Sequence, residues 1–128
     1  MLSRFTGPSA AALLLRLGLG AVLLIFGYGK IADTVSWLGF VPPWMIGLLP
    51  MDPVQFLRVV GVAEVLLGVL LVVGWRVRIV AAVVALHLLT ILAAVARGDL
   101  AVRDFGLFMA AAALGVLGDT RNNTRVDD

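Results

Sequence analysis

Four long apolar stretches, separated by short polar turns, set the pattern of this 128-residue chain. They cover residues 8–30, 53–74, 78–96 and about 100–117, and none contains more than two charged side chains. A helix needs about 20 residues, within a range of roughly 17–25, to cross a bilayer. The pattern therefore predicts four membrane-spanning helices, of which the last three are joined by turns at residues 74–78 and 97–99.

The segment between the first two predicted spans, residues 33–51, is apolar but cannot form one continuous helix. Pro42, Pro43 and Pro50 each remove a backbone donor and break the helical hydrogen-bond ladder. Trp37 and Trp44 are typical of the boundary between membrane and water. We predict that this segment lies on, or dips into, one face of the membrane. The alternative is an ordinary extracytoplasmic loop.

The composition fits a membrane protein, because 62% of the residues are hydrophobic and only 14% are charged. A soluble domain is about 45–50% apolar and about 25% charged. Too few charges are present to give four outer helices a polar face each. We therefore expect an all-α, integral membrane, antiparallel four-helix bundle that forms a single domain and has the lipid bilayer as its surroundings. The scattered arginines give no patch for nucleic acid.

Basic residues are slightly more frequent on the side of the predicted bundle that holds the N-terminus. Positive residues concentrate in cytoplasmic loops. The distribution therefore predicts a multi-pass protein with both termini in the cytoplasm. The five residues on the N-terminal side are Arg4, Arg76, Arg78, Arg121 and Arg125, and the four on the opposite side are Lys30, Arg58, Arg97 and Arg103.

Three ionisable residues, Arg16, Glu64 and His87, lie inside the predicted spans at similar depth. A rise of about 1.5 Å per residue places them about 12, 15 and 13.5 Å from the helix ends on the N-terminal side. A charge at a helix centre costs about 2.5–3.5 kcal/mol, so pairing is favoured. We predict an ion pair between Arg16 and Glu64, with His87 in the same layer. In the alternative, Arg16 extends towards the membrane surface and Glu64 is protonated.

Glycines share a helix face with each of the two predicted partners. Gly20 and Gly27 follow Arg16 on the first span, and Gly61 and Gly68 flank Glu64 on the second. Small residues let membrane helices approach each other closely. We therefore expect these four glycines to form packing surfaces that turn the charges away from lipid.

A second polar cluster belongs to the opposite side of the membrane and has interfacial anchoring as its simplest interpretation. It comprises Lys30, Asp33, Arg58, Asp99, Arg103 and Asp104. The chain has no cysteine, which excludes disulfides, thiol chemistry and a cysteine-bound iron–sulfur cluster within it. A single histidine provides no zinc or copper ligand set, so no metal site is expected.

Three stretches, LLLRLGLGAVLLIFGYGK, GVAEVLLGVLLVVG and RDFGLFMAAAALGVLG, resemble the DoxX family of small four-helix membrane proteins. The resemblance covers about residues 12–118. It is carried by an arginine, spaced glycines and a closing lysine in the first span, and by glutamate and glycine in the second. The matching positions are Arg16, Gly20, Gly27, Lys30, Glu64 and Gly68.

This resemblance implies a redox-associated inner-membrane protein that contacts the quinone pool, because the family is named for the membrane part of a thiosulfate:quinone oxidoreductase. It also implies a partner oxidoreductase, and we expect a homo-oligomer. In one hypothesis, Arg16, Glu64, His87 and Lys30 form a ligand site for a quinone head group. His87 and Glu64 would exchange protons there, and Arg16 would polarise a carbonyl. In the other, the chain is a non-catalytic anchor or assembly subunit with a purely structural Arg16–Glu64 pair.

Overall fold

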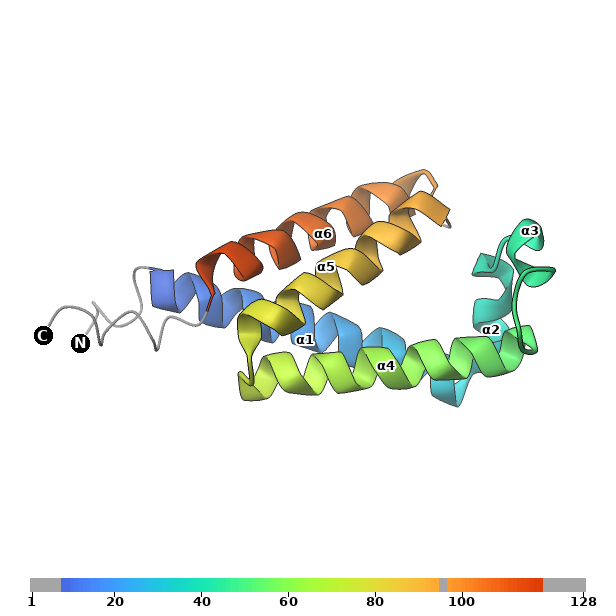
Figure 1. Ribbon diagram of the computed structural model, residues 1–128, viewed down its shortest axis with the longest axis horizontal. Helices are drawn as coiled ribbons and strands as arrows, with labels where there is room; N and C mark the ends of the chain where they lie inside the picture. The colour runs from blue at the N-terminus through green and yellow to red at the C-terminus, as the bar shows by residue number, and fades with distance from the viewer. Residues whose placement is uncertain (1–7, 95–96, 119–128) are drawn as a thin grey trace, which may run out of the picture.

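The computed structural model describes residues 8–94 and 97–118, and this part of the chain is helical, with no strand. Four long helices dominate it (Figure 1). They are α1 (Pro8–Ala32), α4 (Pro53–Val73), α5 (Val77–Ala94) and α6 (Asp99–Leu117). Each is long and apolar enough to cross a membrane. The protein is therefore an all-α four-helix membrane bundle.

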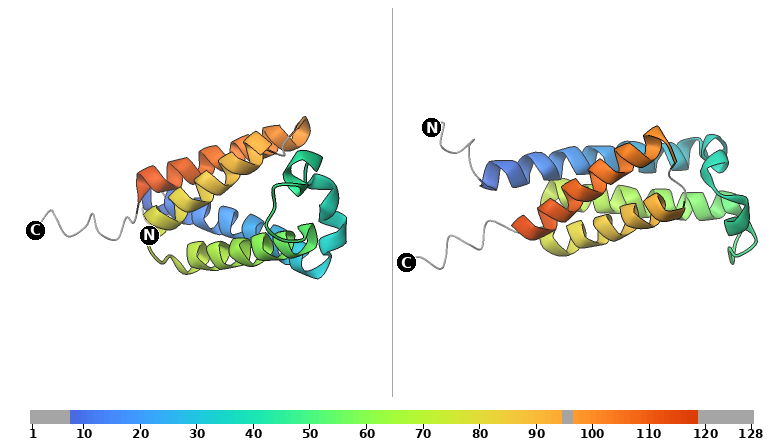
Figure 2. Two further views of the ribbon diagram at one scale, coloured as in Figure 1. Left: turned by 45° about the vertical axis from the view of Figure 1, so that its right-hand side comes forward. Right: turned by 90° about the horizontal axis from the view of Figure 1, so that it is seen from above.

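The bundle consists of two helix pairs, one formed by α1 and α4 and the other by α5 and α6. Contacts within each pair are far more extensive than contacts between the pairs. The pairs lie close together at the end where α1 begins and α6 ends, and they diverge towards the opposite end (Figure 1). The second pair also crosses the first at an angle (Figure 2). The result is a wedge that is open at one end of the bundle.

Short helical pieces of the segment between α1 and α4 lie at the open end of this wedge (Figure 2). They are α2 (Thr34–Trp37), the 3-10 helix η2 (Leu38–Phe40) and α3 (Pro43–Ile46). Pro42 is extended, with ψ at 143°, and Pro43 begins α3. The prolines therefore break the segment as the sequence predicts. Thr34 ties it to α1, because its hydroxyl donates a 2.6 Å hydrogen bond to the carbonyl of Lys30.

The helix ends follow local chemistry. Asp52 precedes Pro53 at the start of α4, where the missing proline N–H would have no helical partner. Gly74 ends α4 in the left-handed region, with φ at 85°, and its N–H donates to the carbonyl of Leu70 at 2.9 Å. Helices commonly end on such a glycine because it has no Cβ to clash. α1 runs two residues further than predicted, so Lys30 lies within its last turn.

Four glycines bring the backbones of α1 and α4 together. A Cβ atom on Gly27 would lie 2.7 Å from the carbonyl oxygen of Gly61, and one on Gly61 would lie 2.8 Å from that of Gly27. Gly20 and Gly68 have the same reciprocal relation, at 3.1 and 2.9 Å. The spacing of seven residues on both helices keeps the two contacts on one seam. No side chain could be accommodated at these points without moving the helices apart.

Every long helix presents large aliphatic side chains on its outer surface. Examples are Leu14, Ile25, Leu66, Leu86 and Val116, each more than half exposed. In water this surface would be an aggregation liability. In a bilayer it faces lipid tails, which agrees with the apolar composition.

Replacing Gly27 by alanine is expected to lower the free energy of unfolding by about 1–3 kcal/mol, the usual penalty for overpacking. The added methyl would meet backbone atoms of both Gly61 and Val65. Gly18 on the same helix is the matched control, because nothing lies within 4 Å of the position that a Cβ would take there. Gly18→Ala should be neutral or stabilise by about 1 kcal/mol through helix propensity. Unfolding followed by circular dichroism in mixed detergent measures both, and equal stability of the two variants would refute the close contact.

Candidate functional site

One carboxylate joins three helices in the interior of the bundle. Glu64 on α4 accepts a 2.8 Å hydrogen bond from Lys30 Nζ of α1 through Oε2, and it lies 2.8 Å from His87 Nε2 of α5 through Oε1. Glu64 is 3% exposed. These residues are the only lysine, the only glutamate and the only histidine of the chain. One oxygen of the Glu64 carboxylate therefore contacts the only lysine of the chain, and the other contacts its only histidine.

The direction of side chains on antiparallel helices explains why Lys30 reaches Glu64. Each Cα–Cβ bond in a helix tilts towards the N-terminus of that helix. Lys30, near the C-terminal end of α1, therefore points into the membrane, and Glu64 on α4 points back towards it. Gly61 provides the space, since the Cβ of Lys30 lies against it. The ammonium is thus drawn inward, and Lys30 is 8% exposed.

The predicted pair between Arg16 and Glu64 is wrong. Arg16 instead donates from Nε to the carbonyl of Leu71 at 3.0 Å and from Nη2 to that of Val72 at 3.2 Å. The depth estimate assumed that the helices begin and end at one level, whereas α1 extends past the end of α4 (Figure 1). The glycine register places Arg16 beside the last turn of α4, and its side chain points away from Glu64.

Arg16 is accordingly a capping residue for α4. The last carbonyls of a helix have no intrahelical donor, and the helix dipole is negative there. The guanidinium supplies donors to two of these carbonyls and lies directly against Gly74. Backbone carbonyls of α4 therefore stabilise this arginine within the membrane, and its side chain does not line the cavity described next.

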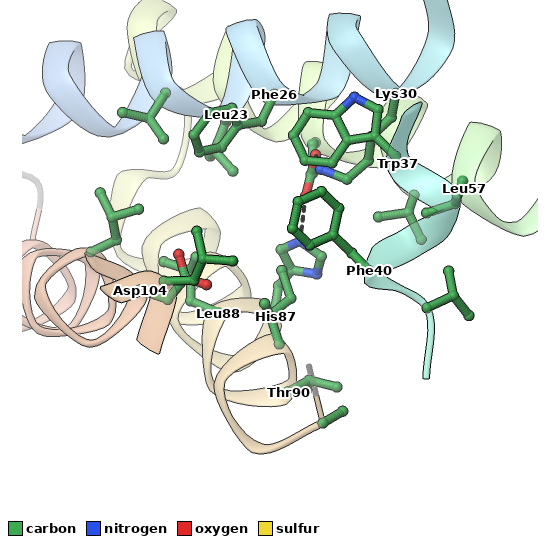
Figure 3. A pocket seen from close by; sticks show the side chains of 18 of the residues that line it. Leu23, Phe26, Lys30, Trp37, Phe40, Leu57, His87, Leu88, Thr90 and Asp104 are labelled. Atoms are coloured by element: carbon green, nitrogen blue, oxygen red, sulfur yellow. Dashed lines mark hydrogen bonds and ion pairs between the residues drawn. The ribbon is translucent and has the colours of Figure 1, made fainter. Parts of the chain in front are cut away.

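A cavity of about 420 Å³ lies in the wedge between the two helix pairs. Lys30, Glu64 and His87 are in its wall, and so are side chains of the segment between α1 and α4, including Trp37 and Phe40 (Figure 3). Most of the remaining wall is aliphatic. Its volume falls within the range of about 300–1,000 Å³ that is usual for small-molecule sites. The polar triad thus borders open space instead of being packed on all sides.

Aromatic rings surround the ammonium group of Lys30. Its Nζ lies 4.2 Å from the ring centroid of Trp37 and 5.9 Å from that of Phe26. Trp37 in turn packs edge-on against Phe26, with ring centroids 5.8 Å apart, and in a tilted arrangement against Phe40, with centroids 5.5 Å apart. Ring faces attract cations, and more strongly where water is excluded. The short-helix segment therefore helps to hold the inward-pointing lysine, a role that the sequence pattern did not predict.

A second ion pair lines the same cavity. Nε and Nη2 of Arg103 both lie 3.0 Å from Oδ1 of Asp104, which is 4% exposed. The guanidinium carbon of Arg103 is 4.9 Å from the ring centroid of Phe26. The predicted polar cluster on this side is therefore divided. Asp104 and Arg103 belong to the cavity, whereas Arg58 and Asp33 are exposed, and Asp33 accepts a hydrogen bond from Ser36.

The charges around the cavity balance. Two cations, Lys30 and Arg103, are paired one to one with two carboxylates, Glu64 and Asp104. Unpaired charges in an apolar site are costly, whereas hydrogen-bonded pairs are tolerated. Among residues 8–94 and 97–118, no group of three or more histidine or acidic side chains could hold a metal ion. The arrangement suits a neutral ligand with a few polar atoms.

The fold and this cavity define a small four-span membrane protein with an internal polar site. The chain belongs to the DoxX family, since the DoxX family model matches residues 11–97, more than half of its length. The match includes the glycine seam and the residues Lys30, Glu64 and His87, but ends before α6. No curated protein and no solved structure matches the chain.

Proposed function

We propose that this DoxX protein is a redox-associated component of the inner membrane that binds a quinone head group in its internal cavity. The observation that carries the proposal is the position of the Lys30–Glu64–His87 triad. It lies in the wall of a mostly apolar cavity of about 420 Å³. A quinone requires an apolar slot for its ring and tail together with polar groups at its two oxygens, and the cavity offers both.

The structure changes the roles that the sequence suggested. Arg16 is outside the cavity, so it is not the group that polarises a carbonyl. His87 borders the cavity and is oriented by Glu64, which is itself fixed by Lys30. A carboxylate that holds an imidazole in one orientation is a common way to prepare it for proton exchange. His87 is therefore the residue placed to exchange a proton with the ligand.

The alternative function is a non-catalytic membrane anchor or assembly subunit. It is favoured by the mutual satisfaction of Lys30, Glu64 and His87, which would lock α1, α4 and α5 whether or not a ligand is present. A purely structural lock would, however, be expected in a filled core. The open cavity beside the triad therefore favours binding. Because the chain has no cysteine, any thiol or sulfur chemistry would come from a partner oxidoreductase.

Decylubiquinone should quench the fluorescence of Trp37 in a variant carrying Trp44→Phe and Trp75→Phe, because Trp37 is then the sole tryptophan and lies in the cavity wall. In this background, His87→Ala should weaken binding at least tenfold, about 1.4 kcal/mol. It removes a polar group of the cavity and leaves the Lys30–Glu64 pair intact. Titration in lipid nanodiscs gives the dissociation constants.

Arg16→Ala is the matched control for this experiment, since Arg16 is an intramembrane cation that does not line the cavity. Folded Arg16→Ala protein should bind decylubiquinone as tightly as the parent. Absence of binding by the parent, or equal affinity of folded His87→Ala protein, would reject the quinone site and leave the anchor function.

We also propose that the turn between α4 and α5, and with it both chain termini, faces the cytoplasm. The turn exposes Arg76 and Arg78. At the opposite end Arg58 and Arg97 are exposed as well, whereas Lys30 is buried against Glu64. The proposal therefore rests on the count over the sequence, which has five basic residues on the side of this turn and four on the opposite side.

Single cysteines at Trp75 and Ser36 test this orientation, because both positions are exposed and the native chain has no competing thiol. A membrane-impermeant maleimide applied to spheroplasts should label Ser36→Cys, and should label Trp75→Cys only after permeabilisation. The reverse pattern would invert the orientation. Labelling of both cysteines from the same side would show that α4 does not cross the membrane.

A further inference from the structure

The guanidinium of Arg103 keeps hydrogen-bond donors that its ion pair does not use. Nε and Nη2 of Arg103 both contact Oδ1 of Asp104, each at 3.0 Å. A guanidinium carries further N–H groups, on Nη1 and a second one on Nη2. Within residues 8–94 and 97–118, no hydrogen bond from Nη1 to another residue is formed. The charge of Arg103 is therefore neutralised, but its capacity to donate hydrogen bonds is only partly used.

Arg103 is also the more accessible of the two cations in the cavity wall. Its side chain is 45% exposed, whereas that of Lys30 is 10% exposed and contacts both Glu64 and the ring of Trp37. Arg103 lies near the start of α6, and helical side chains tilt towards the N-terminus of their helix. This tilt directs the guanidinium towards the open end of the wedge. A ligand can therefore reach Arg103 without breaking an ion pair.

One aromatic ring relates Arg103 to the triad of Lys30, Glu64 and His87. The guanidinium carbon of Arg103 lies 4.9 Å from the ring centroid of Phe26, and Nζ of Lys30 lies 5.9 Å from the same centroid. The two cations are thus no farther apart than these two distances together. Both cations, Phe26 and His87 line the cavity. The triad and Arg103 therefore border the same part of it.

We propose that Arg103 is a ligand-binding residue of the cavity and donates a hydrogen bond to an oxygen atom of the quinone head group. A carbonyl that enters an apolar cavity loses its hydrogen bonds to water, and leaving it unpaired costs free energy. A hydrogen bond from a charged donor is about twice as strong as one between neutral groups. Arg103 can supply this bond while Asp104 still balances its charge. This inference rests on the proposed function, because it names a further contact of the same ligand.

Solid-state NMR in lipid bilayers tests this contact directly. Decylubiquinone carries an isotope label at its ring carbonyl carbons, and the protein carries one at the guanidinium nitrogens of arginine. Wild-type protein should show a dipolar coupling between a ligand carbonyl and a guanidinium. Arg103→Met should abolish this coupling and weaken the binding of decylubiquinone at least tenfold, because methionine has no N–H donor. Both measurements on this variant are made in an Asp104→Asn background, so that no carboxylate is left unpaired.

Arg58→Met in the same background is the matched control, because Arg58 is exposed and outside the cavity. It should keep both the coupling and the affinity of the Asp104→Asn protein. If wild-type protein binds decylubiquinone without a coupling to arginine, or if the coupling persists in the Arg103→Met variant, the inference is overturned and the proposed function stands. Failure of wild-type protein to bind decylubiquinone would overturn both. The wild-type measurement depends on no variant that has to fold.

Discussion

The carboxylate of Glu64 is the interaction on which the rest of the structure depends. It is buried in the interior of a membrane bundle and bonded to an ammonium from α1 and an imidazole from α5. A lone charge in that position would be expensive. Removing one partner of a buried pair typically costs about 3–5 kcal/mol, because the other charge remains. The same group therefore fixes the relative placement of three helices.

Close packing and open space are combined in this bundle through the placement of small residues. The glycine seam brings α1 and α4 into backbone contact, which lets Lys30 and Glu64 meet across the helix pair. The α5–α6 pair has no such seam with α1 and α4, and it diverges from them (Figure 1). The cavity occupies this divergence, and Trp37 and Phe40 are part of its wall. A DoxX protein of this architecture has a polar site facing an apolar slot inside the membrane.

Much of the fold follows from the sequence, because the length and hydropathy of the four spans leave few arrangements other than a four-helix membrane bundle. Proline positions also predict where the segment before α4 breaks. Gly27 and Gly61 are recognisable as packing residues, since they share a helix face with a charge. The partner of Glu64 was assigned wrongly because residue counting gives the depth of Cα atoms and not the direction of side chains. Arg16 and Lys30 both point towards the N-terminus of α1, which carries Arg16 away from Glu64 and Lys30 towards it.

The aromatic groups around Lys30 and the role of Asp104 could not be predicted in the same way. Trp37 belongs to a short helix whose position depends on turns and not on a repeating pattern. Asp104 looked like an interfacial residue because it lies near the start of α6, yet the tilt of the second helix pair carries it into the cavity wall. Both depend on how the pairs cross, which hydropathy does not encode.

Solid-state NMR in lipid bilayers tests the central claim most directly, because Lys30, Glu64 and His87 are the only residues of their types. Selective isotope labelling of glutamate, lysine and histidine gives one signal for each side chain. The dipolar couplings from the Glu64 carboxylate should be strong to both the Lys30 ammonium and the His87 Nε2, as the two 2.8 Å contacts require. No coupling should appear to a labelled arginine guanidinium. A strong coupling to arginine, with none to Lys30, would contradict the account.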